Sequence, residues 1–169
     1  MQKVILVNSN DKKVGTLEKL EAHKKGKLHR AFSIFIFNSK RELMLQKRAN
    51  NKYHCPGLWS NTVCSHPEPD KKIIETVHKR LREEMGFNCD LKKIFSFKYK
   101  VKFENKLVEN EIDHVFIGTY DRTPKLNPKE ASAWKWIKIN DLKKDINKNP
   151  DKYTYWLKKS FRRAFKYNK

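Results

Sequence analysis

Apolar residues follow two periodicities along the chain, and these predict a mixture of strands and helices. Runs that combine branched and aromatic residues with alternating polar ones are typical of strands. Such runs cover residues 4–8, 31–38, 43–47, 91–103, 107–120 and 134–139. The polar sequence Asn38-Ser39-Lys40-Arg41 separates the second run from the third and predicts a hairpin between them.

Helical spacing is clearest in residues 71–85. Apolar side chains recur there at intervals of three and four and therefore share one face: Ile73, Ile74, Val77, Leu81 and Met85. Asp70 is the predicted N-cap of this helix, and Gly86 is its predicted end. Residues 141–147 and 153–167 predict two further helices, separated by Pro150.

The order of these elements predicts a mixed β-sheet flanked by helices, an α/β (α+β) fold. A length of 169 residues suits one domain with its own core, and neither a repeat nor a Pro/Gly/Ser-rich linker interrupts the chain. We therefore expect residues 1–169 to form a single domain. The chain is strongly basic, with a formal net charge of +20.

Such a charge raises the question of nucleic acid as a partner. Lysine greatly outnumbers arginine, however, and the basic residues are spread along the chain rather than interleaved with aromatic ones. We therefore expect no nucleic-acid partner. Two interpretations of the charge stay open: a lysine-rich surface without a specific ligand, or a basic patch that binds a small anionic substrate.

The protein is expected to be cytoplasmic. No run approaches the roughly 18 apolar residues that a membrane helix needs, so no membrane partner is expected. Residues 1–8 lack the apolar core of an export signal. The three cysteines, Cys55, Cys64 and Cys89, are an odd number and are expected to be reduced thiols.

Two short segments carry most of the candidate chemistry. Cys64 and His66 are two residues apart, as are Glu109 and Glu111, and in extended backbone such pairs point to the same face. A thiol, an imidazole and two carboxylates that converge on one pocket could form a metal site, an acid–base pair, or both. Each has a plainer alternative: Cys64 as a small buried apolar residue, and the glutamates as a solvated strand end.

The six histidines add a candidate metal shell. His23 and His29 flank a short polar loop that could turn both imidazoles inward. Together with His66, Glu109 and Glu111 they would provide nitrogen and oxygen ligands, which suit Mn²⁺, Zn²⁺ or Mg²⁺. The other three histidines, His54, His78 and His114, are expected to be ordinary surface residues.

The end of the predicted helix resembles the Nudix signature R-E-U-x-E-E-x-G-U, in which U is a bulky apolar residue. The matching residues are Leu81, Glu83, Glu84, Gly86 and Phe87. Lys79 stands at the position of the usual Arg, and Arg80 at that of a Glu. A Nudix hydrolase uses several carboxylates of this helix to hold Mg²⁺ against a diphosphate. With fewer acids here, the helix is expected to hold one Mg²⁺ through Glu84 and to hydrolyse poorly.

Further short sequence motifs extend the resemblance from about residue 4 to about residue 160. The whole chain resembles the type I isopentenyl-diphosphate Δ-isomerases, a Nudix-like family. The matching words are Gly15-Thr16-Leu17-Glu18-Lys19, Ala22-His23, Leu28-His29-Arg30-Ala31-Phe32-Ser33, Lys47-Arg48-Ala49, Pro56-Gly57-Leu58-Trp59-Ser60-Asn61, Cys64-Ser65-His66-Pro67, Phe97-Lys98-Tyr99 and Val108-Glu109-Asn110-Glu111. His54-Cys55 precedes Pro56, where an aromatic or other bulky residue is expected in this family.

The resemblance implies that the protein isomerises isopentenyl diphosphate to dimethylallyl diphosphate through a tertiary carbocation, in isoprenoid biosynthesis. It implies four catalytic residues: Cys64 and Glu111 as the acid–base pair in either order, Tyr99 beside the carboxylate, and Trp156 facing the cation. Core packing is the alternative for Trp156.

The implied ligand sites complete the expectation. Diphosphate contacts are expected from Lys19, Arg48, Lys52 and Arg80, with Mg²⁺ on Glu84. One divalent metal, Mn²⁺, Zn²⁺ or Mg²⁺, is expected on His23, His29, His66, Glu109 and Glu111, and no flavin. The protein is expected to be a monomer or weak homodimer. Two other functions remain open: a Nudix pyrophosphohydrolase, and a non-enzymatic RNA-binding module.

Overall fold

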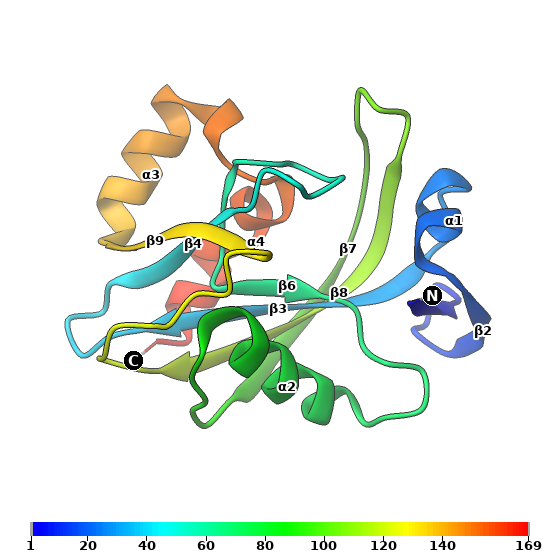
Figure 1. Ribbon diagram of the computed structural model, residues 1–169, viewed down its shortest axis with the longest axis horizontal. Coiled ribbons are helices and arrows are strands. Elements are labelled where there is room, and N and C mark those ends of the chain that lie inside the picture. The colour runs from blue at the N-terminus through cyan, green and yellow to red at the C-terminus, as the bar shows by residue number, and fades with distance from the viewer. Residues whose placement is uncertain (1, 169) are drawn as a thin grey trace.

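The computed structural model describes residues 2–168. Four α-helices and one short 3-10 helix accompany the strands (Figure 1): α1 (Lys19–Lys24), α2 (Ile73–Met85), α3 (Ile139–Lys148), η1 (Pro150–Lys152) and α4 (Tyr155–Lys166). The strands are β1 (Lys3–Val7), β2 (Lys13–Glu18), β3 (His29–Phe37), β4 (Leu43–Arg48), β5 (Trp59–Ser60), β6 (Val63–Ser65), β7 (Lys92–Lys102), β8 (Val108–Thr119) and β9 (Ala131–Ile137).

Strand β3 is the centre of a mixed sheet. On one side it pairs in parallel with β8, from His29 opposite Glu111 to Phe37 opposite Thr119. On the other side it pairs antiparallel with β1, β6 and β4, and β4 in turn pairs with β9 and β5. Strand β7 lies antiparallel to the far edge of β8. The predicted mixed sheet with flanking helices is confirmed.

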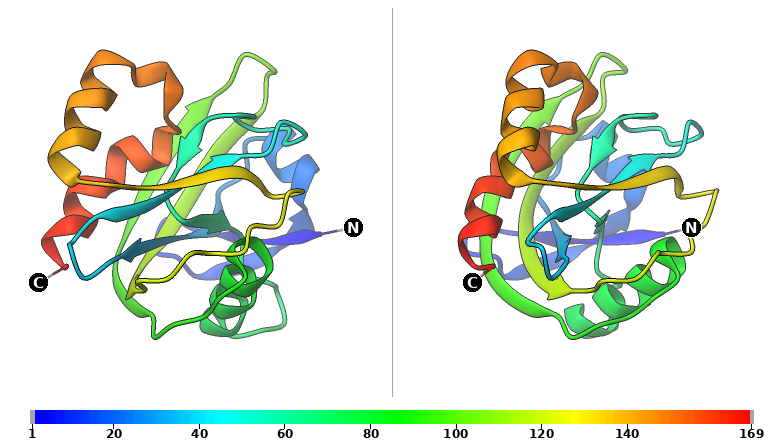
Figure 2. Two further views of the ribbon diagram at one scale, coloured as in Figure 1. Left: turned by 60° about the vertical axis from the view of Figure 1, so that its left-hand side comes forward. Right: turned by 90° about the vertical axis from the view of Figure 1, so that its left-hand side faces the viewer.

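Both faces of the sheet are covered by apolar side chains, which explains why β3 is a continuous apolar run. Phe35 and Phe37 of β3 pack with Leu157 and Phe161 of α4. The alternate positions of the same strand pack in a second cluster, against α2: Phe32, Ile34 and Ile36 with Val77, Leu81 and Met85. Figure 2 shows α4 (red) and α2 (green) on different sides of the sheet.

Several local predictions are confirmed and others are corrected. The hairpin at residues 38–41 is present, with the Asn38 amide bonded to the Glu42 carbonyl at 3.0 Å, and Gly86 ends α2 in the left-handed conformation. Asp70 does not cap α2, because the helix begins at Ile73 and its N-cap is Lys72. Strand β2, helix α1 and the short strands β5 and β6 were not predicted; each is brief or rich in lysine and has little apolar periodicity of its own.

The sheet brings the two segments singled out above close together. Cys64 on β6 is the register partner of Ser33 on β3, and Glu111 on β8 is the register partner of His29 on β3. A single strand, β3, therefore lies between Cys64 and Glu111. Helix α1 and the loop between β4 and β5 close the same region (Figure 1). Within residues 2–168, no helix is both long and apolar enough to cross a membrane.

Candidate active site

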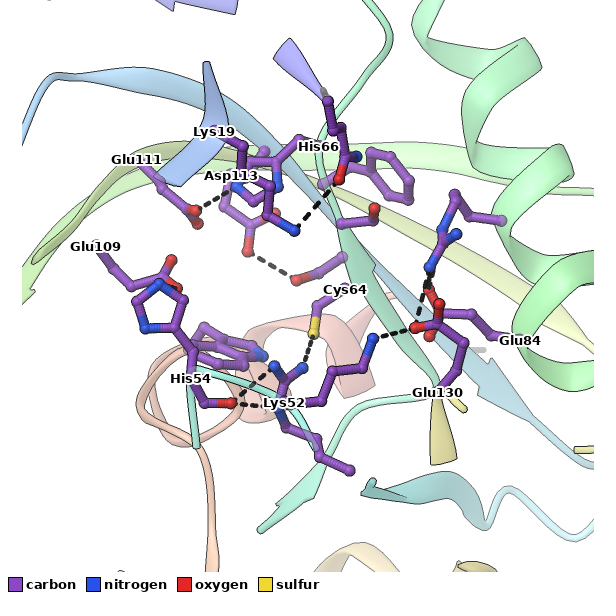
Figure 3. Close-up of a pocket in the computed structure, with 18 of the residues that line it drawn as sticks. Lys19, Lys52, His54, Cys64, His66, Glu84, Glu109, Glu111, Asp113 and Glu130 are labelled. Atoms are coloured by element: carbon purple, nitrogen blue, oxygen red, sulfur yellow. Dashed lines mark hydrogen bonds and ion pairs between the residues drawn. The ribbon is translucent and has the colours of Figure 1, made fainter. Parts of the chain in front are cut away.

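A pocket opens at the junction of β3, β6 and β8. Most residues with a predicted catalytic or binding role line this pocket: Lys19, Arg48, Lys52, Cys64, His66, Arg80, Glu84, Tyr99, Glu109, Glu111 and Trp156. His23 and His29 lie directly behind, fully buried against this wall. Figure 3 shows Cys64 between the glutamates of β8 and the cluster around Glu84.

The histidines and glutamates form one buried cluster at the base of the pocket. His66 Nε2 lies 2.9 Å from Glu111 Oε1, and His29 Nε2 lies 3.2 Å from the same oxygen. The ring centroids of His23 and His29 are 4.8 Å apart, so the loop between them does turn both imidazoles inward. Ligand atoms of His23, His29, His66 and Glu111 all lie within 4.8 Å of one another.

Backbone carbonyls orient two of these imidazoles. His23 Nδ1 lies 2.6 Å from the Lys19 carbonyl, and His29 Nδ1 lies 2.8 Å from that of Lys27. An Nδ1–H that donates to a carbonyl leaves Nε2 with a free lone pair, which is the usual arrangement of a metal-ligating histidine. The Nε2 of His23 is buried without a hydrogen-bond partner. The cluster therefore fits a divalent cation, since a buried unpaired nitrogen is otherwise costly.

The two carboxylates of the cluster differ in proton affinity. Burial, followed by repulsion from Glu111, raises the pKa of Glu109 well above its usual value. Burial would also raise that of Glu111, but hydrogen bonds with His29 and His66 outweigh it, so the pKa of Glu111 lies well below its usual value. Glu111 is therefore the anionic member of the pair. The Tyr99 hydroxyl donates to Glu111 Oε2 at 2.5 Å and also lies 3.2 Å from Glu109 Oε2.

Cys64 lies at the other side of the pocket with a cation and an indole beside it. Arg48 donates from Nη1 to Cys64 Sγ at 3.4 Å, and its guanidinium lies 5.5 Å from the centre of the Trp156 ring. Trp156 Nε1 donates to Ser60 Oγ at 2.9 Å, and Ser60 Oγ lies 3.8 Å from Cys64 Sγ. Burial raises the pKa of the Cys64 thiol to about 12, although Arg48 opposes this, so the thiol is protonated at neutral pH.

The basic residues meet two carboxylates near the mouth of the pocket. Arg80 donates to Glu84 Oε1 at 2.8 Å and pairs with Glu130 at 3.2 Å. Lys52 also pairs with Glu130, and Gln46 donates to Glu84 at 3.1 Å. Burial raises the pKa of Glu84, against the effect of Arg80. Glu83 lies outside the pocket lining, bonded to Arg80 on the exposed side of α2.

Residues of the site that sequence reasoning missed include His54, Asp113 and Glu130, which line the pocket, and Ser60, which contacts Cys64. His54 and His114 were expected at the surface, but both are buried; His54 faces Glu109 at 3.4 Å, and His114 pairs with Asp11 at 2.8 Å. Asp113 continues the alternation of Glu109 and Glu111 along β8 and accepts from Ser33 at 2.7 Å, so strand periodicity could have found it. Glu130 precedes β9 and carried no such signal.

Comparison with known proteins agrees with the family that the sequence motifs predict. The NUDIX domain model matches residues 27–157. An isopentenyl-diphosphate Delta-isomerase 2 from Aromatoleum aromaticum is 54% identical over 154 residues, which are 91% of this chain and 82% of that protein. The isopentenyl-diphosphate Delta-isomerase of Pectobacterium atrosepticum is 44% identical over 163 residues, 96% of this chain and 91% of its own.

Solved structures support the fold. A crystal structure from Deinococcus radiodurans superposes with a TM-score of 0.81 at 20% identity and covers 96% of this chain and 99% of its own. The MutT protein of Methanosarcina mazei superposes with a TM-score of 0.67 at 22% identity, over 84% and 96%. These two establish the architecture, and the curated relatives establish the family. The chain therefore belongs to the type I isopentenyl-diphosphate Delta-isomerases of the Nudix fold.

Proposed function

We propose that this protein converts isopentenyl diphosphate to dimethylallyl diphosphate for isoprenoid biosynthesis, with Cys64 and Glu111 as its proton-exchanging pair. The observation that carries this assignment is the pocket itself. A protonated thiol on β6 and an anionic carboxylate on β8 share one cavity, with four cationic side chains close by.

The chemistry needs two proton transfers and no electron transfer. The terminal alkene carbon takes up a proton, which leaves a tertiary carbocation at the branched carbon. A proton then leaves the neighbouring carbon next to the diphosphate-bearing one, and its electron pair forms the new double bond. An acid and a base held on either side of the carbon skeleton can perform both steps without a flavin.

Each side of the pocket holds a group suited to these steps. Cys64 keeps its proton at neutral pH, and Tyr99 holds a proton directly against Glu111 Oε2. A divalent cation bound by His23, His29, His66, Glu109 and Glu111 would supply positive charge that sets the proton affinity of Glu111. Tyr99 is then placed to carry a proton to or from that carboxylate.

The diphosphate is expected at the cationic mouth of the pocket. Lys19, Arg48, Lys52 and Arg80 all line the cavity, and anions are attracted to such a set. The carboxylate of Glu84 would hold Mg²⁺ against the diphosphate, since Mg²⁺ prefers carboxylate and phosphate oxygens. Arg80 takes the place of an acid in the Nudix signature, which favours substrate binding over hydrolysis.

Trp156 is expected to stabilise the carbocation through its π-face. Its ring lines the pocket beside Cys64 and is fixed by the bond to Ser60. Cation–π attraction at a dehydrated site is worth about 2 kcal/mol, or about 1.4 units of log rate. Exclusion of water contributes further, because water would trap the cation as an alcohol.

The test is incubation with isopentenyl diphosphate and Mg²⁺ in deuterated water, followed by NMR. We expect dimethylallyl diphosphate that carries deuterium in a methyl group. Cys64→Ala should lower the rate by about 10²–10⁴-fold, the usual contribution of a positioned acid or base. Cys89→Ala, which changes a cysteine outside this pocket, is the matched control and should retain the wild-type rate.

Other outcomes would assign the pocket differently. Release of phosphate from the substrate would favour the pyrophosphohydrolase alternative. Unchanged, unlabelled substrate with a loaded metal shell would exclude the proposed reaction. Tight, strongly salt-dependent RNA binding that is unaffected by Cys64→Ala would support the RNA-binding alternative.

A further inference from the structure

His54 is a buried imidazole beside the metal cluster with no role in the mechanism above. It lies in the loop between β4 and β5 and is 4% exposed. Its Nε2 lies 3.4 Å from Glu109 Oε1, and its ring centroid lies 4.7 Å from that of His23. We propose that His54 is a direct ligand of the divalent metal, so that four imidazoles and two carboxylates surround one ion.

The first argument is that His54 lacks any other partner. Neither Nδ1 nor Nε2 has a hydrogen-bond partner among the described residues, although both atoms are buried. Each buried unsatisfied polar group costs about 1–3 kcal/mol, so native proteins rarely keep one without a reason. In Figure 3 the His54 ring lies beside the Glu109 carboxylate. A metal ion at this position would satisfy the nitrogen that faces Glu109.

The second argument concerns the number of ions. Ligand atoms of His23, His54 and Glu109 lie within 4.8 Å of one another, and so do those of His23, His29, His66 and Glu111. His23 is common to both groups, and its Nδ1 is engaged with the Lys19 carbonyl. Only Nε2 remains, and one nitrogen lone pair binds one metal ion. His54 and Glu109 would therefore share the ion of the other group, so the cluster would hold one metal ion rather than two.

The composition of this shell has a consequence for metal choice. Imidazole nitrogen suits Zn²⁺, Co²⁺ and Ni²⁺ better than Mg²⁺, which prefers oxygen. A fourth imidazole in place of a water or a further carboxylate oxygen should strengthen that preference. This inference rests on the metal shell of the proposed function and adds His54 to it.

The test counts imidazoles around the bound metal. X-ray absorption of the Zn²⁺-loaded wild-type protein should show four imidazole ligands, and His54→Asn should show three. Competition with a chromophoric chelator should show at least about tenfold weaker Zn²⁺ binding in His54→Asn, with less change for Mg²⁺. His114→Asn is the matched control, because His114 is also a buried imidazole but lies on β8 and pairs with Asp11 outside the cluster.

Three imidazoles in the wild-type protein would overturn the proposal, even if His54→Asn weakened binding, because His54 would then only position Glu109. Equal affinities and equal counts in the wild type and His54→Asn would overturn it as well. If His54→Asn does not fold, the number of imidazole ligands measured in the wild-type protein decides alone. Failure of the wild-type protein to bind Zn²⁺ stoichiometrically would contradict the metal site of the proposed function too, whereas loss of the His54 effect alone would leave that site intact.

Discussion

Ser60 links Cys64 and Trp156, two of the residues proposed to act on the carbon skeleton. Its hydroxyl accepts hydrogen bonds from Trp156 Nε1 at 2.9 Å and from Thr154 Oγ1 at 3.1 Å, and it contacts Cys64 Sγ at 3.8 Å. Because Ser60 is fully buried, no water can take over these bonds. The position of the indole relative to the thiol therefore depends on one side chain outside the pocket lining.

Ser60→Ala should lower kcat and leave the KM for substrate nearly unchanged, because Ser60 bonds to Trp156 and to none of the four proposed diphosphate contacts. It should also cost about 1–3 kcal/mol of stability, since the Trp156 N–H loses its acceptor. Steady-state kinetics and urea unfolding measure the two effects. Ser60→Thr keeps the hydroxyl and should restore kcat. A loss of stability with kcat intact would mean that Ser60 serves packing alone.

At this scale, residue type and spacing predicted part of the site. The alternation of Cys64 with His66 and of Glu109 with Glu111 marked both walls of the pocket, because strand geometry alone places such pairs on one face. Sequence reasoning missed His54 and Glu130, which come from loops whose path depends on the folded chain. A lone histidine in a loop has no periodicity, so its burial beside Glu109 became evident only in the structure.

The C-terminal end of α2 provides a prediction at the scale of secondary-structure elements. Gly86 has φ +74°, and a Cβ at this position would lie 2.5 Å from the Lys125 carbonyl oxygen. Both the left-handed backbone and the close approach favour glycine. This turn ends the helix that carries Arg80 and Glu84, so its geometry also supports the proposed diphosphate site.

Gly86→Ala should therefore destabilise the protein by about 1–3 kcal/mol, as expected for strained backbone. The melting temperature should fall by about 2–4 °C for each kcal/mol in a chain of this size. Gly15→Ala is the matched control, because nothing lies within 4 Å of a Cβ there, and it should stay within about 0.5 kcal/mol. Equal melting temperatures for the two variants would contradict the steric argument.

Asp145 joins α3 to the segment that leads into α4. It accepts hydrogen bonds from Tyr153 Oη and from Asn149 Nδ2, the latter at 2.7 Å. The bond from Tyr153, followed by that from Asn149, lowers the pKa of Asp145 below its usual 3.8. A lowered pKa in the folded state stabilises the protein above pH 3.8, and this stabilisation is lost as the pH falls further.

Asp145→Asn should accordingly lower the melting temperature at pH 7, and the difference from wild type should shrink as the pH falls below about 3.8. Thermal melts between pH 7 and pH 3 provide the measurement. Asp141→Asn removes an exposed charge from the same helix and serves as the control. A difference that stays constant over the whole range would mean that the carboxylate charge contributes nothing.

Long periodic elements were predicted better than short ones. The strands that became β3, β7 and β8 and the helix α2 each span enough residues for the apolar pattern to be seen. β5 and β6 span two and three residues, and they are strands only because β4 and β3 lie beside them. Tertiary contacts, rather than local sequence, determine such elements.

At the scale of the whole molecule, the net charge of +20 would attract an anionic substrate toward the four cationic side chains that line the pocket. A diphosphate would be attracted by the summed field before it reached the proposed contacts Lys19, Lys52 and Arg80. Salt shortens the range of this field, from about 10 Å at 0.1 M to about 3 Å at 1 M. The charge thus favours encounter with an anionic substrate even where individual lysines lie far from the pocket.

We therefore expect kcat/KM for isopentenyl diphosphate to fall as NaCl is raised from 0.02 to 0.5 M, with kcat nearly unchanged, because screening slows encounter and leaves the bound complex alone. Lys143→Glu with Lys144→Glu reverses two exposed charges on α3, outside the pocket lining. If the whole surface contributes, this double variant should have a lower kcat/KM at low salt and a flatter salt dependence. If it matches wild type at every salt concentration, the attraction comes from the pocket alone. A kcat/KM that does not change with salt would mean that the basic surface has no part in substrate capture.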